Sequence, residues 1–200
     1  MTKLVLIRHG VTKWNKNKIV QGHTDIPLDT SGQQQDSNWI LPQNLNNFRW
    51  ISSPLGLATE TANILSGFHP ETDNRLIEMD WGQWEGCILD DLREKLGDLM
   101  AAWEARGLDF RAPDGESPRE VQKRLKDLFF DIFKQKEDTI AVCHKGVIRA
   151  AYAMAVGWDM KSKPNDKILD NCLHIFEVEF GGALSIVEMN VSMQNIKYVI

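Results

Sequence analysis

The feature that most constrains this 200-residue chain is a pair of apolar runs, far apart in the sequence, that both end on a histidine. Each histidine stands beside a basic residue and a glycine: Leu4–Ile7 is followed by Arg8-His9-Gly10, and Thr139–Cys143 by His144-Lys145-Gly146. Short unbroken apolar runs are typical of strands that are buried on both faces of a sheet. Ligands of open α/β sheets bind at the carboxyl ends of such strands. The sequence therefore predicts that the two histidines share one site.

The residue types in these motifs indicate an anion as the ligand. A fixed cation beside an imidazole can bind an anion that the imidazole attacks or protonates. Gly10 permits a sharp turn and the close approach of a ligand. Taken alone, Arg8-His9-Gly10 fits a capped surface turn equally well, because short motifs recur by chance. The matching second motif favours the site.

The rest of the chain alternates predicted strands with predicted helices. An extended segment at 74–78 is expected to lead into a loop at 79–86 that is rich in tryptophan and glycine, and Gly181-Gly182 predicts a hairpin turn. This pattern is typical of a three-layer α/β/α sandwich, with a mostly parallel sheet and an antiparallel edge strand, formed by a single domain over residues 1–200. We expect strands at 2–7, 49–52, 139–143, 174–179 and 184–189, and helices at 31–41, 54–66, 118–133 and 145–156.

Two helix starts have clear local signals. Ser53 and Pro54 are expected at the N-cap and the first helical position, with Gly67 ending that helix. Ser117 and Glu120 have the spacing of a capping box. The apolar residues that follow are spaced as on one face of a helix: Val121, Leu125, Leu128, Phe129, Ile132 and Phe133. The basic residues of the same segment are predicted to form a solvated face: Lys123, Arg124 and Lys126.

Charge and cysteine usage argue against several classes of protein. A formal net charge of −5 disfavours nucleic acid as a partner. Cys87, Cys143 and Cys172 have neither metal-site nor disulfide-framework spacing, which indicates reduced thiols and a cytoplasmic protein. Cys143 beside His144 is a conceivable nucleophile, but alternation along a strand predicts that the two side chains point apart. We find no apolar stretch of membrane-spanning length and no signal-peptide pattern.

The two histidine motifs belong to a longer series that resembles the histidine phosphatase superfamily, the phosphoglycerate-mutase-like enzymes, and within it the compact phosphatases. A series of this length is far more specific than either motif alone, and it implies the phosphoglycerate-mutase-like fold. The matching positions follow the family's order: Leu6-Ile7-Arg8-His9-Gly10-Val11-Thr12 with Asn15; Gln21-Gly22, Asp25, Pro27-Leu28 and Gly32; Ser53-Pro54-Leu55, Ala58, Glu60, Thr61 and Ala62; Leu76, Glu78, Gly82, Trp84, Glu85 and Gly86; Gly115-Glu116-Ser117; and His144 to Arg149.

The resemblance also implies a chemistry. His9 would be the nucleophile that accepts a phosphoryl group, and Glu78 the acid that protonates the leaving oxygen. His144 would stabilise the transferring group, whose oxygens Arg8 would bind. Fixed donors of this kind suit a transition state with spread negative charge. His9 must attack in its neutral form, so its other ring nitrogen should donate to a carbonyl. Neither a metal nor a cofactor is expected, because the cations are side chains.

The chain departs from the family pattern at two positions. Leu57 stands where the second signature normally has an arginine, so a bidentate phosphate ligand is missing; charge-assisted hydrogen bonds contribute about 1.5–3 kcal/mol each. Lys145 stands where a small residue is usual. It can restore the lost charge as a point donor, although not the planar fork. The alternatives are that Lys145 points to solvent, or that an arginine of the segment 98–114 supplies the charge.

Further residues are assigned to the margins of the site. By resemblance, Asn15 and Thr24 are expected to donate to phosphate, although Thr24 is better explained as a turn residue. Trp81 and Trp84 either line the cleft or only pack. Segment 98–114 is the predicted lid and specificity segment, with Trp103, Arg106, Phe110 and Arg111. No partner can be assigned to the remaining histidines: His23, His69 and His174.

Three functions are compatible with these residues. The first is a metal-independent phosphomonoester hydrolase that acts on a small metabolite of the sugar phosphate or α-ribazole phosphate type. The second is a phosphoglycerate-type mutase, although such mutases are usually longer. The third is a degenerate phosphate-binding or regulatory protein, because of Leu57, but His9, Glu78 and His144 are all retained. The expected partner is a small phosphorylated metabolite, without nucleic acid or membrane, and the sequence leaves a homo-oligomer open.

Overall fold

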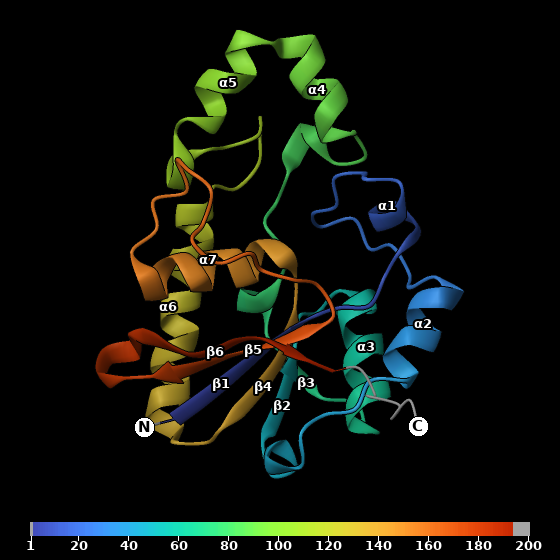
Figure 1. Ribbon diagram of the computed structural model, residues 1–200, viewed down its shortest axis with the longest axis vertical. Coiled ribbons are helices and arrows are strands. Elements are labelled where there is room, and N and C mark those ends of the chain that lie inside the picture. The colour runs from blue at the N-terminus through green and yellow to red at the C-terminus, as the bar shows by residue number, and fades with distance from the viewer. Residues whose placement is uncertain (1, 194–200) are drawn as a thin grey trace, which may run out of the picture.

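The computed structural model describes residues 2–193 and holds one six-stranded sheet between two layers of helices (Figure 1). The strands are β1 (Thr2–Arg8), β2 (Arg49–Ser52), β3 (Glu71–Thr72), β4 (Thr139–Cys143), β5 (Cys172–Val178) and β6 (Leu184–Ser192). The helices are α1 (Lys13–Lys16), α2 (Thr30–Ser37), α3 (Gly56–Ser66), α4 (Leu89–Leu96), α5 (Asp98–Glu104), α6 (Pro118–Gln135) and α7 (Lys145–Val156). Short 3-10 helices lie at 43–45, 74–76, 82–84, 107–109 and 180–182.

The sheet order is β3-β2-β4-β1-β5-β6. The four strands from β3 to β1 are parallel, and β5 and β6 form an antiparallel hairpin at one edge. The expected architecture is therefore confirmed. Central strands β1 and β4 pair in register from Leu4 opposite Thr139 to Arg8 opposite Cys143. This register places the residues that follow the two strands side by side at the same edge of the sheet.

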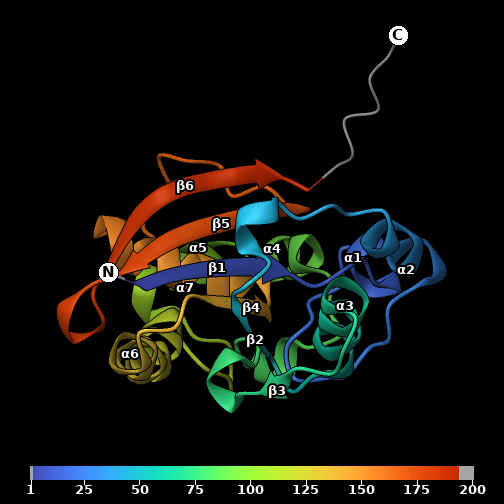
Figure 2. The same ribbon diagram turned by 90° about the horizontal axis from the view of Figure 1, so that it is seen from below.

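Alternation along the central strands decides which helix layer each residue packs against. Leu4 and Leu6 of β1 belong to one apolar core, which α6 and α7 complete, whereas Val5 and Ile7 belong to a second core, which α3 completes. These four side chains are fully buried. Figure 2 shows that α6 and α7 cover one face of the sheet, whereas α1, α2 and α3 lie on the side of the other face. A strand covered on both faces needs an unbroken apolar run.

Three of the differences from the sequence-based expectation concern segments near the end of the sheet at which the strand-end motifs lie or the helices that follow them. The second helix ends at Ser37 and not near 41. The segment at 74–78 is not extended, because the Asp73 carboxylate caps a 3-10 helix by accepting the N–H of Arg75. Helix α3 begins at Gly56, and Ser53 does not cap it. The Asp25 carboxylate accepts the N–H of Gly56 at 2.9 Å instead, which satisfies a donor at the free helix end.

The predicted lid, residues 98–114, contains α5 and the 3-10 helix at 107–109. Together with α4, α5 forms a helical hairpin at the top of Figure 1, beyond the end of the sheet. Within residues 2–193, no helix has the length and apolar character that crossing a bilayer requires. The three cysteines are free thiols.

Candidate active site

The carboxyl ends of three neighbouring parallel strands bring three polar side chains to one place. Ser53 follows β2, His144 follows β4 and His9 follows β1, in the order of the strands in the sheet. The His144 Nε2 atom lies 2.7 Å from the Ser53 hydroxyl oxygen, and the ring centroids of His144 and His9 are 5.2 Å apart. Ser53 was not recognised from the sequence as a site residue, although it obeys the strand-end rule that identified the two histidines.

The His9 ring is held in one tautomer. Its Nδ1 atom lies 2.7 Å from the carbonyl oxygen of Gly10. A carbonyl only accepts, so Nδ1 carries the hydrogen and Nε2 keeps a free lone pair. Burial, reinforced by the neighbouring Arg8 charge, lowers the pKa of His9 to about 3. His9 is therefore neutral at physiological pH, as a nucleophilic imidazole must be.

A buried hydrogen-bond chain fixes the peptide that orients His9. The N–H of Gly10 donates to the Thr61 hydroxyl at 2.9 Å, and that hydroxyl donates to the Asp36 carboxylate at 2.8 Å. A Cβ at position 10 would overlap the Asp36 carboxylate, so a glycine is required there. Burial raises the pKa of Asp36 to about 6. Nothing in the sequence pattern pointed to Asp36.

His144 is also buried and neutral. Only 1% of it is exposed, and burial holds its pKa well below the usual range, with further contributions from His9 and Arg8. The adjoining Cys143 is fully buried, and burial raises the pKa of its thiol. Since a nucleophilic cysteine needs an accessible thiolate, this environment argues against Cys143 as a nucleophile.

Glu78 reaches the site from the loop after the 3-10 helix at 74–76. One carboxylate oxygen accepts the N–H of Met79 at 2.8 Å, and the other accepts the N–H of Gly146 at 3.0 Å. A Cβ at position 146 would overlap the Glu78 carboxylate, so glycine lets the start of α7 approach it. The side chain is buried, and burial, the largest influence, raises the pKa of Glu78. A raised pKa suits a group that must give and retake a proton.

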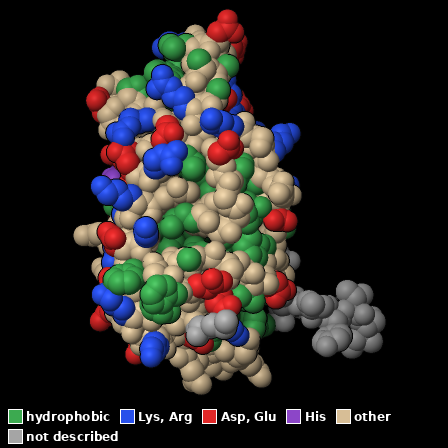
Figure 3. All heavy atoms as spheres, turned by 90° about the vertical axis from the view of Figure 1, so that its left-hand side faces the viewer, with side chains coloured by type: hydrophobic (Ala, Val, Ile, Leu, Met, Phe, Trp, Pro, Cys, Tyr) green, Lys and Arg blue, Asp and Glu red, His purple; other side chains and the backbone are tan. Residues whose placement is uncertain are grey.

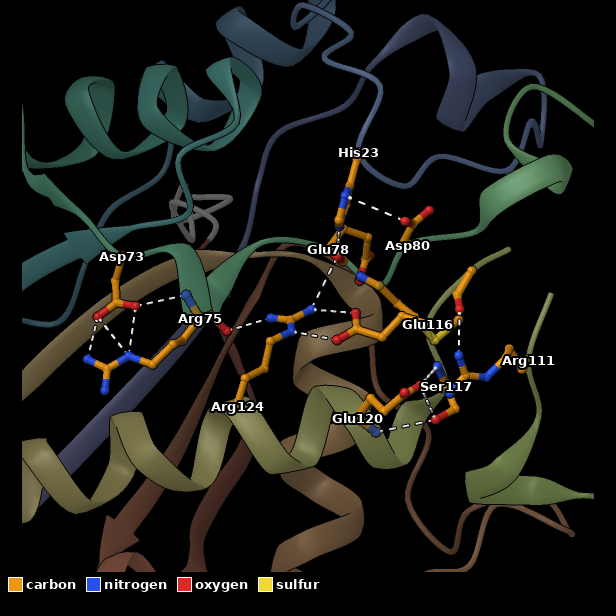
Figure 4. A network of polar contacts seen from close by, with 12 residues as sticks. His23, Asp73, Arg75, Glu78, Asp80, Arg111, Glu116, Ser117, Glu120 and Arg124 are labelled. Atoms are coloured by element: carbon orange, nitrogen blue, oxygen red, sulfur yellow. Dashed lines mark hydrogen bonds and ion pairs between the residues drawn. The ribbon is translucent and has the colours of Figure 1, made fainter. Parts of the chain in front are cut away.

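The backbone of Glu78 is fixed by two donors, which Figure 4 shows. The Arg124 guanidinium donates to the Glu78 carbonyl at 3.2 Å, and the His23 Nε2 atom lies 2.9 Å from the same oxygen. Arg124 is itself held by both carboxylate oxygens of Glu116, at 2.9 and 3.0 Å. This network locates Glu78 from α6 on one side and from the loop after α1 on the other.

The prediction of a solvated face was wrong for Arg124. Its side chain is only 18% exposed and contacts the site through Glu78. A signal was present in the sequence, because Arg124 lies three residues after Val121 and four before Leu128, in the apolar stripe of α6. Two histidines without assigned partners also have one: His23 contacts the Glu78 carbonyl, and the buried His174 accepts the N–H of Asn190 at 3.4 Å. His69 is exposed.

Two cations lie at the mouth of the site and share one carboxylate. Arg8 contacts Asp170 at 2.7 Å and Lys145 contacts it at 3.4 Å. The Arg8 Nε atom is buried without a hydrogen-bond partner in the described part of the chain. Asp170 precedes β5 and was missed from the sequence, because it lies in no motif. Its contacts show that Lys145 is directed to the same place as Arg8.

Two predicted phosphate ligands differ in their placement. Asn15 lines the site, but its Oδ1 atom accepts the N–H of Thr12 in a capping box at the start of α1. Its amide nitrogen donates to the Gln21 side-chain oxygen at 3.4 Å. Thr24 does not line the cavity at His9; its N–H and hydroxyl both donate to Glu85. The interpretation of Thr24 as a turn residue is the one that the structure supports.

These groups line a cavity of about 940 Å³ that extends from His9 to the α4–α5 hairpin. Arg8, His9, Glu78 and His144 all line it, as the strand-end motifs predict. Trp81 and Phe110 line its outer part, whereas Trp84 is buried and packs on Trp103 at 5.3 Å between ring centroids. Across residues 2–193, no three His, Cys, Asp or Glu side chains are grouped in a way that would hold a metal ion.

Comparison with known proteins places the fold and the site in a family. Residues 4–192 match the model of the histidine phosphatase superfamily, branch 1. The chain belongs to this superfamily. It is 30% identical over 170 residues to phosphoserine phosphatase 1 of Hydrogenobacter thermophilus, which covers 80% of this chain and 79% of that protein. A crystal structure of phosphoserine phosphatase from Entamoeba histolytica, in complex with 3-phosphoglyceric acid, superimposes with a TM-score of 0.80 at 28% identity, over 96% of this chain and 98% of that one.

A further similarity is to a shorter stretch of a curated relative. The chain is 35% identical over 129 residues to a protein named probable phosphoglycerate mutase GpmB, from Salmonella arizonae. The match covers 62% of this chain and spans only 60% of the length of that relative. The names of the relatives thus include both phosphatase and mutase.

The histidine phosphatase pattern leads us to expect an arginine at position 57, and the structure shows where the leucine sits. Leu57 is the second residue of α3 and is fully buried. It packs in an apolar cluster with Leu28 and Leu55. It lines neither the cavity described above nor an adjoining cavity of about 620 Å³ that is also lined by Arg8 and His9. The arginines of the predicted lid do not replace it, because Arg106 and Arg111 line neither cavity. Lys145 is the cation that lies beside Arg8.

We therefore expect Lys145→Ala to lower kcat/KM for phosphate esters by about tenfold, or about 1.4 kcal/mol. The Lys145 ammonium and the Arg8 guanidinium both contact Asp170, so the two cations lie close together. Loss of the ammonium should weaken phosphate binding, because only Arg8 of this pair remains. Steady-state kinetics with the exposed Lys13→Ala variant as a control measure the effect. A change below twofold for Lys145→Ala would show that the lysine does not compensate for Leu57.

Burial of His9 also makes the free energy of unfolding depend on pH. The folded-state pKa of His9 is about 3, against an ordinary value of 6.5, so between these pH values the unfolded chain binds a proton that the folded chain does not. Stability is then lost as the pH falls, by about 2 kcal/mol for this group between about pH 7 and pH 5. Urea unfolding at both pH values should show that His9→Ala removes this part of the loss.

The comparison between variants cancels the contributions of groups that do not interact with His9, whereas the contribution of His144, whose pKa His9 helps to lower, changes with it. Asp36 has a raised pKa and acts in the opposite direction, but it is present in both proteins and cancels. His69→Ala, which changes an exposed histidine, should keep the wild-type dependence on pH. An equal loss of stability in wild type and His9→Ala would show that His9 is not held neutral by burial.

Proposed function

We propose that this protein is a metal-independent phosphomonoester hydrolase that acts through a phosphohistidine at His9 on a small phosphorylated metabolite. One observation carries the proposal: the buried, neutral His9 lines one cavity with Arg8, Glu78 and His144. The Gly10 carbonyl fixes the tautomer of His9, and the ring centroids of His9 and His144 are 5.2 Å apart. A nucleophile, anion donors and a proton donor therefore meet in one place. The chain's superfamily and the phosphatase names of its relatives support the same reaction class.

In the first half-reaction, the lone pair of His9 Nε2 attacks the phosphorus atom. The bond between phosphorus and the ester oxygen breaks, and its electron pair leaves with that oxygen. Protonated Glu78 gives the oxygen its proton, so an alcohol departs and a carboxylate remains. Arg8, Lys145 and the His144–Ser53 pair surround the transferring oxygens, whose charge they stabilise.

In the second half-reaction, a water molecule attacks the phosphohistidine. The Glu78 carboxylate takes the proton of the water, the bond between phosphorus and Nε2 breaks, and inorganic phosphate is released. His9 regains its lone pair and Glu78 its proton, so the cycle closes. Two easier steps replace one difficult displacement. The α4–α5 hairpin and the 3-10 helix at 107–109, which line the outer cavity, act as the lid that excludes bulk water.

The test is phosphate release from a panel of phosphorylated metabolites and from p-nitrophenyl phosphate, with and without a chelator. We expect release in both conditions, together with an acid-labile, base-stable phosphoprotein after rapid quenching. Loss of activity in the chelator would exclude the mechanism. Absence of turnover on every ester, with phosphate still bound, would favour the regulatory alternative that Leu57 suggests.

A mutase is the second candidate, because one relative carries a phosphoglycerate mutase name. It would use the same phosphohistidine and return the phosphoryl group to a second hydroxyl of the same molecule in place of water. Incubation with 3-phosphoglycerate separates the two. A hydrolase releases inorganic phosphate and glycerate, whereas a mutase yields 2-phosphoglycerate without net release of phosphate.

A further inference from the structure

The two cations at the phosphate end share a carboxylate that comes from a segment without a motif. The Arg8 Nη1 atom contacts Asp170 at 2.7 Å, and the Lys145 ammonium contacts the same carboxylate at 3.4 Å. Burial acts to raise the pKa of Asp170, but the charges of Arg8 and Lys145 outweigh it and hold that pKa below its ordinary value. Asp170 is therefore ionised at neutral pH and can bind both cations with charge-assisted hydrogen bonds.

The contact with Asp170 leaves one part of the Arg8 guanidinium available. Asp170 occupies Nη1, whereas Nε is buried without a hydrogen-bond partner among residues 2–193. A buried N–H without a partner costs free energy, and a phosphate oxygen can supply the missing acceptor. Lysine has a flexible stem and freely rotating donors, so Lys145 also needs an anchor if it is to stay beside Arg8. The carboxylate thus holds two mobile side chains as a fixed pair of donors.

The segment that carries Asp170 is held by Asn190 of β6. The Asn190 Oδ1 atom accepts the N–H of Leu169 at 2.8 Å, and its amide nitrogen donates to the Lys167 carbonyl at 2.9 Å. We call these two bonds the Asn190 clamp. They fix the backbone on both sides of the buried Ile168, and Asp170 is the next residue after them. The clamp therefore determines where the Asp170 carboxylate lies.

Asn190 stands in a bulge of β6. Leu173 of β5 lies opposite Val191. Ile175 lies opposite Glu188, so β6 carries one more residue than β5 between the two pairs. Asn190 lies within this bulge with a φ of 61°, a left-handed conformation that asparagine adopts more readily than most residues. Bulges redirect side chains and are frequent beside active sites.

The backbone of Asn190 is fixed in turn by His174 of β5. The Asn190 N–H donates to His174 Nδ1 at 3.4 Å, and His174 is fully buried. Burial lowers the pKa of His174 to about 4, against smaller opposite contributions from the Leu169 backbone and Asp170. His174 is therefore neutral at pH 7 and keeps a lone pair for this bond. The Asn190 clamp is thus attached to a buried part of the sheet.

A fixed position matters here because the surroundings of Asp170 are basic. The segment between α7 and β5, orange in Figure 1, carries three lysines: Lys161, Lys163 and Lys167. Figure 3 faces the side of the molecule on which this segment lies and shows Lys and Arg side chains gathered in its upper half. Exposed ion pairs differ little in free energy, so a carboxylate on a loosely held segment has no strong preference among cations. The Asn190 clamp assigns Asp170 to Arg8 and Lys145.

We propose that Asp170 is a positioning residue of the phosphate site and that Asn190 places it there. The inference rests on the proposed function and deepens it. Asp170 holds Arg8 and Lys145 in the arrangement that receives the transferring oxygens, and both Asp170 and Asn190 act through these cations. An anchored lysine can then serve at a site where Leu57 replaces the arginine of the family pattern.

The first experiment replaces Asp170 with asparagine, which keeps the size of the side chain and removes its charge. Because 43% of the Asp170 side chain is exposed, this variant is expected to fold. We expect kcat for p-nitrophenyl phosphate to fall about tenfold, since Arg8 and Lys145 lose their common anchor. The Kd of inorganic phosphate should not rise, because the substitution removes a negative charge close to a bound anion. Steady-state kinetics and calorimetric titration measure the two effects.

The second experiment tests the Asn190 clamp with Asn190→Ala and Asn190→Gly. Both variants lose the two side-chain bonds, but glycine adopts a positive φ without strain and so separates the clamp from the backbone conformation. We expect kcat to fall about fivefold in both. In the Asp170→Asn background neither should lower kcat further, because residues that act through one network are not additive. Asn47→Ala, which changes an exposed asparagine outside both cavities, should leave kcat unchanged.

Binding of phosphate and orthovanadate gives a readout that does not need turnover. Orthovanadate takes the five-coordinate geometry of the transition state, whereas phosphate stays tetrahedral. For Asp170→Asn, the Kd of orthovanadate relative to that of phosphate should rise about tenfold, because the orientation of the cations matters most in the transition state. Loss of folded protein alone would lower the number of binding sites without changing this ratio.

The outcomes separate this inference from the proposed function. Wild-type kcat in Asp170→Asn, or an unchanged ratio of the two Kd values, would overturn the inference and leave the phosphatase proposal intact. Losses of kcat that add in the double variants would show that Asn190 does not act through Asp170, and would overturn its assignment. A wild type that hydrolyses no ester but shows the change in ratio would overturn the phosphatase proposal and leave the inference intact.

Discussion

Replacing His9 with alanine is expected to abolish phosphate release and to remove the phosphoprotein that rapid quenching traps in the wild type. His9 is the buried imidazole whose Nε2 lone pair is free, because Nδ1 is committed to the Gly10 carbonyl at 2.7 Å. Without His9, the phosphoryl group has no acceptor in the site. The remaining hydrogen-bond donors can still bind phosphate, but the transfer to histidine does not take place. Loss of the nucleophile in a comparable catalytic unit costs about six orders of magnitude in kcat. Phosphate-release and quench assays on the same preparations measure both effects.

His69→Ala is the matched control for this experiment, since it removes an exposed histidine that lies outside both cavities. It should retain wild-type turnover and phosphorylation. Binding of inorganic phosphate to His9→Ala, measured by calorimetry, shows whether the pocket is still formed. A phosphoprotein that persists in His9→Ala with full turnover would place the nucleophile elsewhere.

The central part of the site could be predicted because it follows from sheet geometry. The carboxyl ends of neighbouring parallel strands lie at one edge of a sheet. The motifs that follow β1 and β4 therefore predicted that His9 and His144 lie close together. Apolar runs and a capping box likewise determined the strands and α6. Ser53 also follows a parallel strand, but the neighbouring Pro54 favoured its interpretation as a helix N-cap. In the structure, the Asp25 carboxylate accepts the N–H of Gly56 at the start of α3 instead.

The parts that were missed depend on contacts between distant segments. Asp36 meets Thr61 and Gly10 across the interface between α2, α3 and the first strand end, and no local periodicity encodes that meeting. Asp170 joins Arg8 and Lys145 from a segment without a motif. Charged residues on a helix are usually exposed to solvent, so the contact of Arg124 with Glu78 was not predicted. An arginine within an apolar stripe is the local sign of a buried partner, here the carbonyl of Glu78 and the carboxylate of Glu116.

Replacing Glu78 with glutamine is expected to separate the two half-reactions. The amide of the Glu78→Gln variant cannot give a proton to the leaving oxygen, so turnover of alkyl phosphates should fall by about 10²–10⁴. The nitrophenolate of p-nitrophenyl phosphate leaves without a proton, so phosphorylation of His9 should survive. Water attack on the phosphohistidine then lacks its base. Stopped-flow absorbance should therefore show a burst of about one equivalent of nitrophenolate per site, followed by slow steady-state release.

The local environment of Glu78 decides how this variant should be controlled. Both carboxylate oxygens accept backbone N–H groups, from Met79 and Gly146, whereas an amide offers one oxygen and one NH2. One buried N–H is left unpaired at a cost of about 1–3 kcal/mol in stability, so unfolding must be measured beside activity. Glu94→Gln, on the exposed face of α4, changes the same side chain without touching the site. An equal loss on alkyl phosphates and p-nitrophenyl phosphate without a burst would contradict proton donation by Glu78, because a general acid matters in proportion to the basicity of the oxygen it serves.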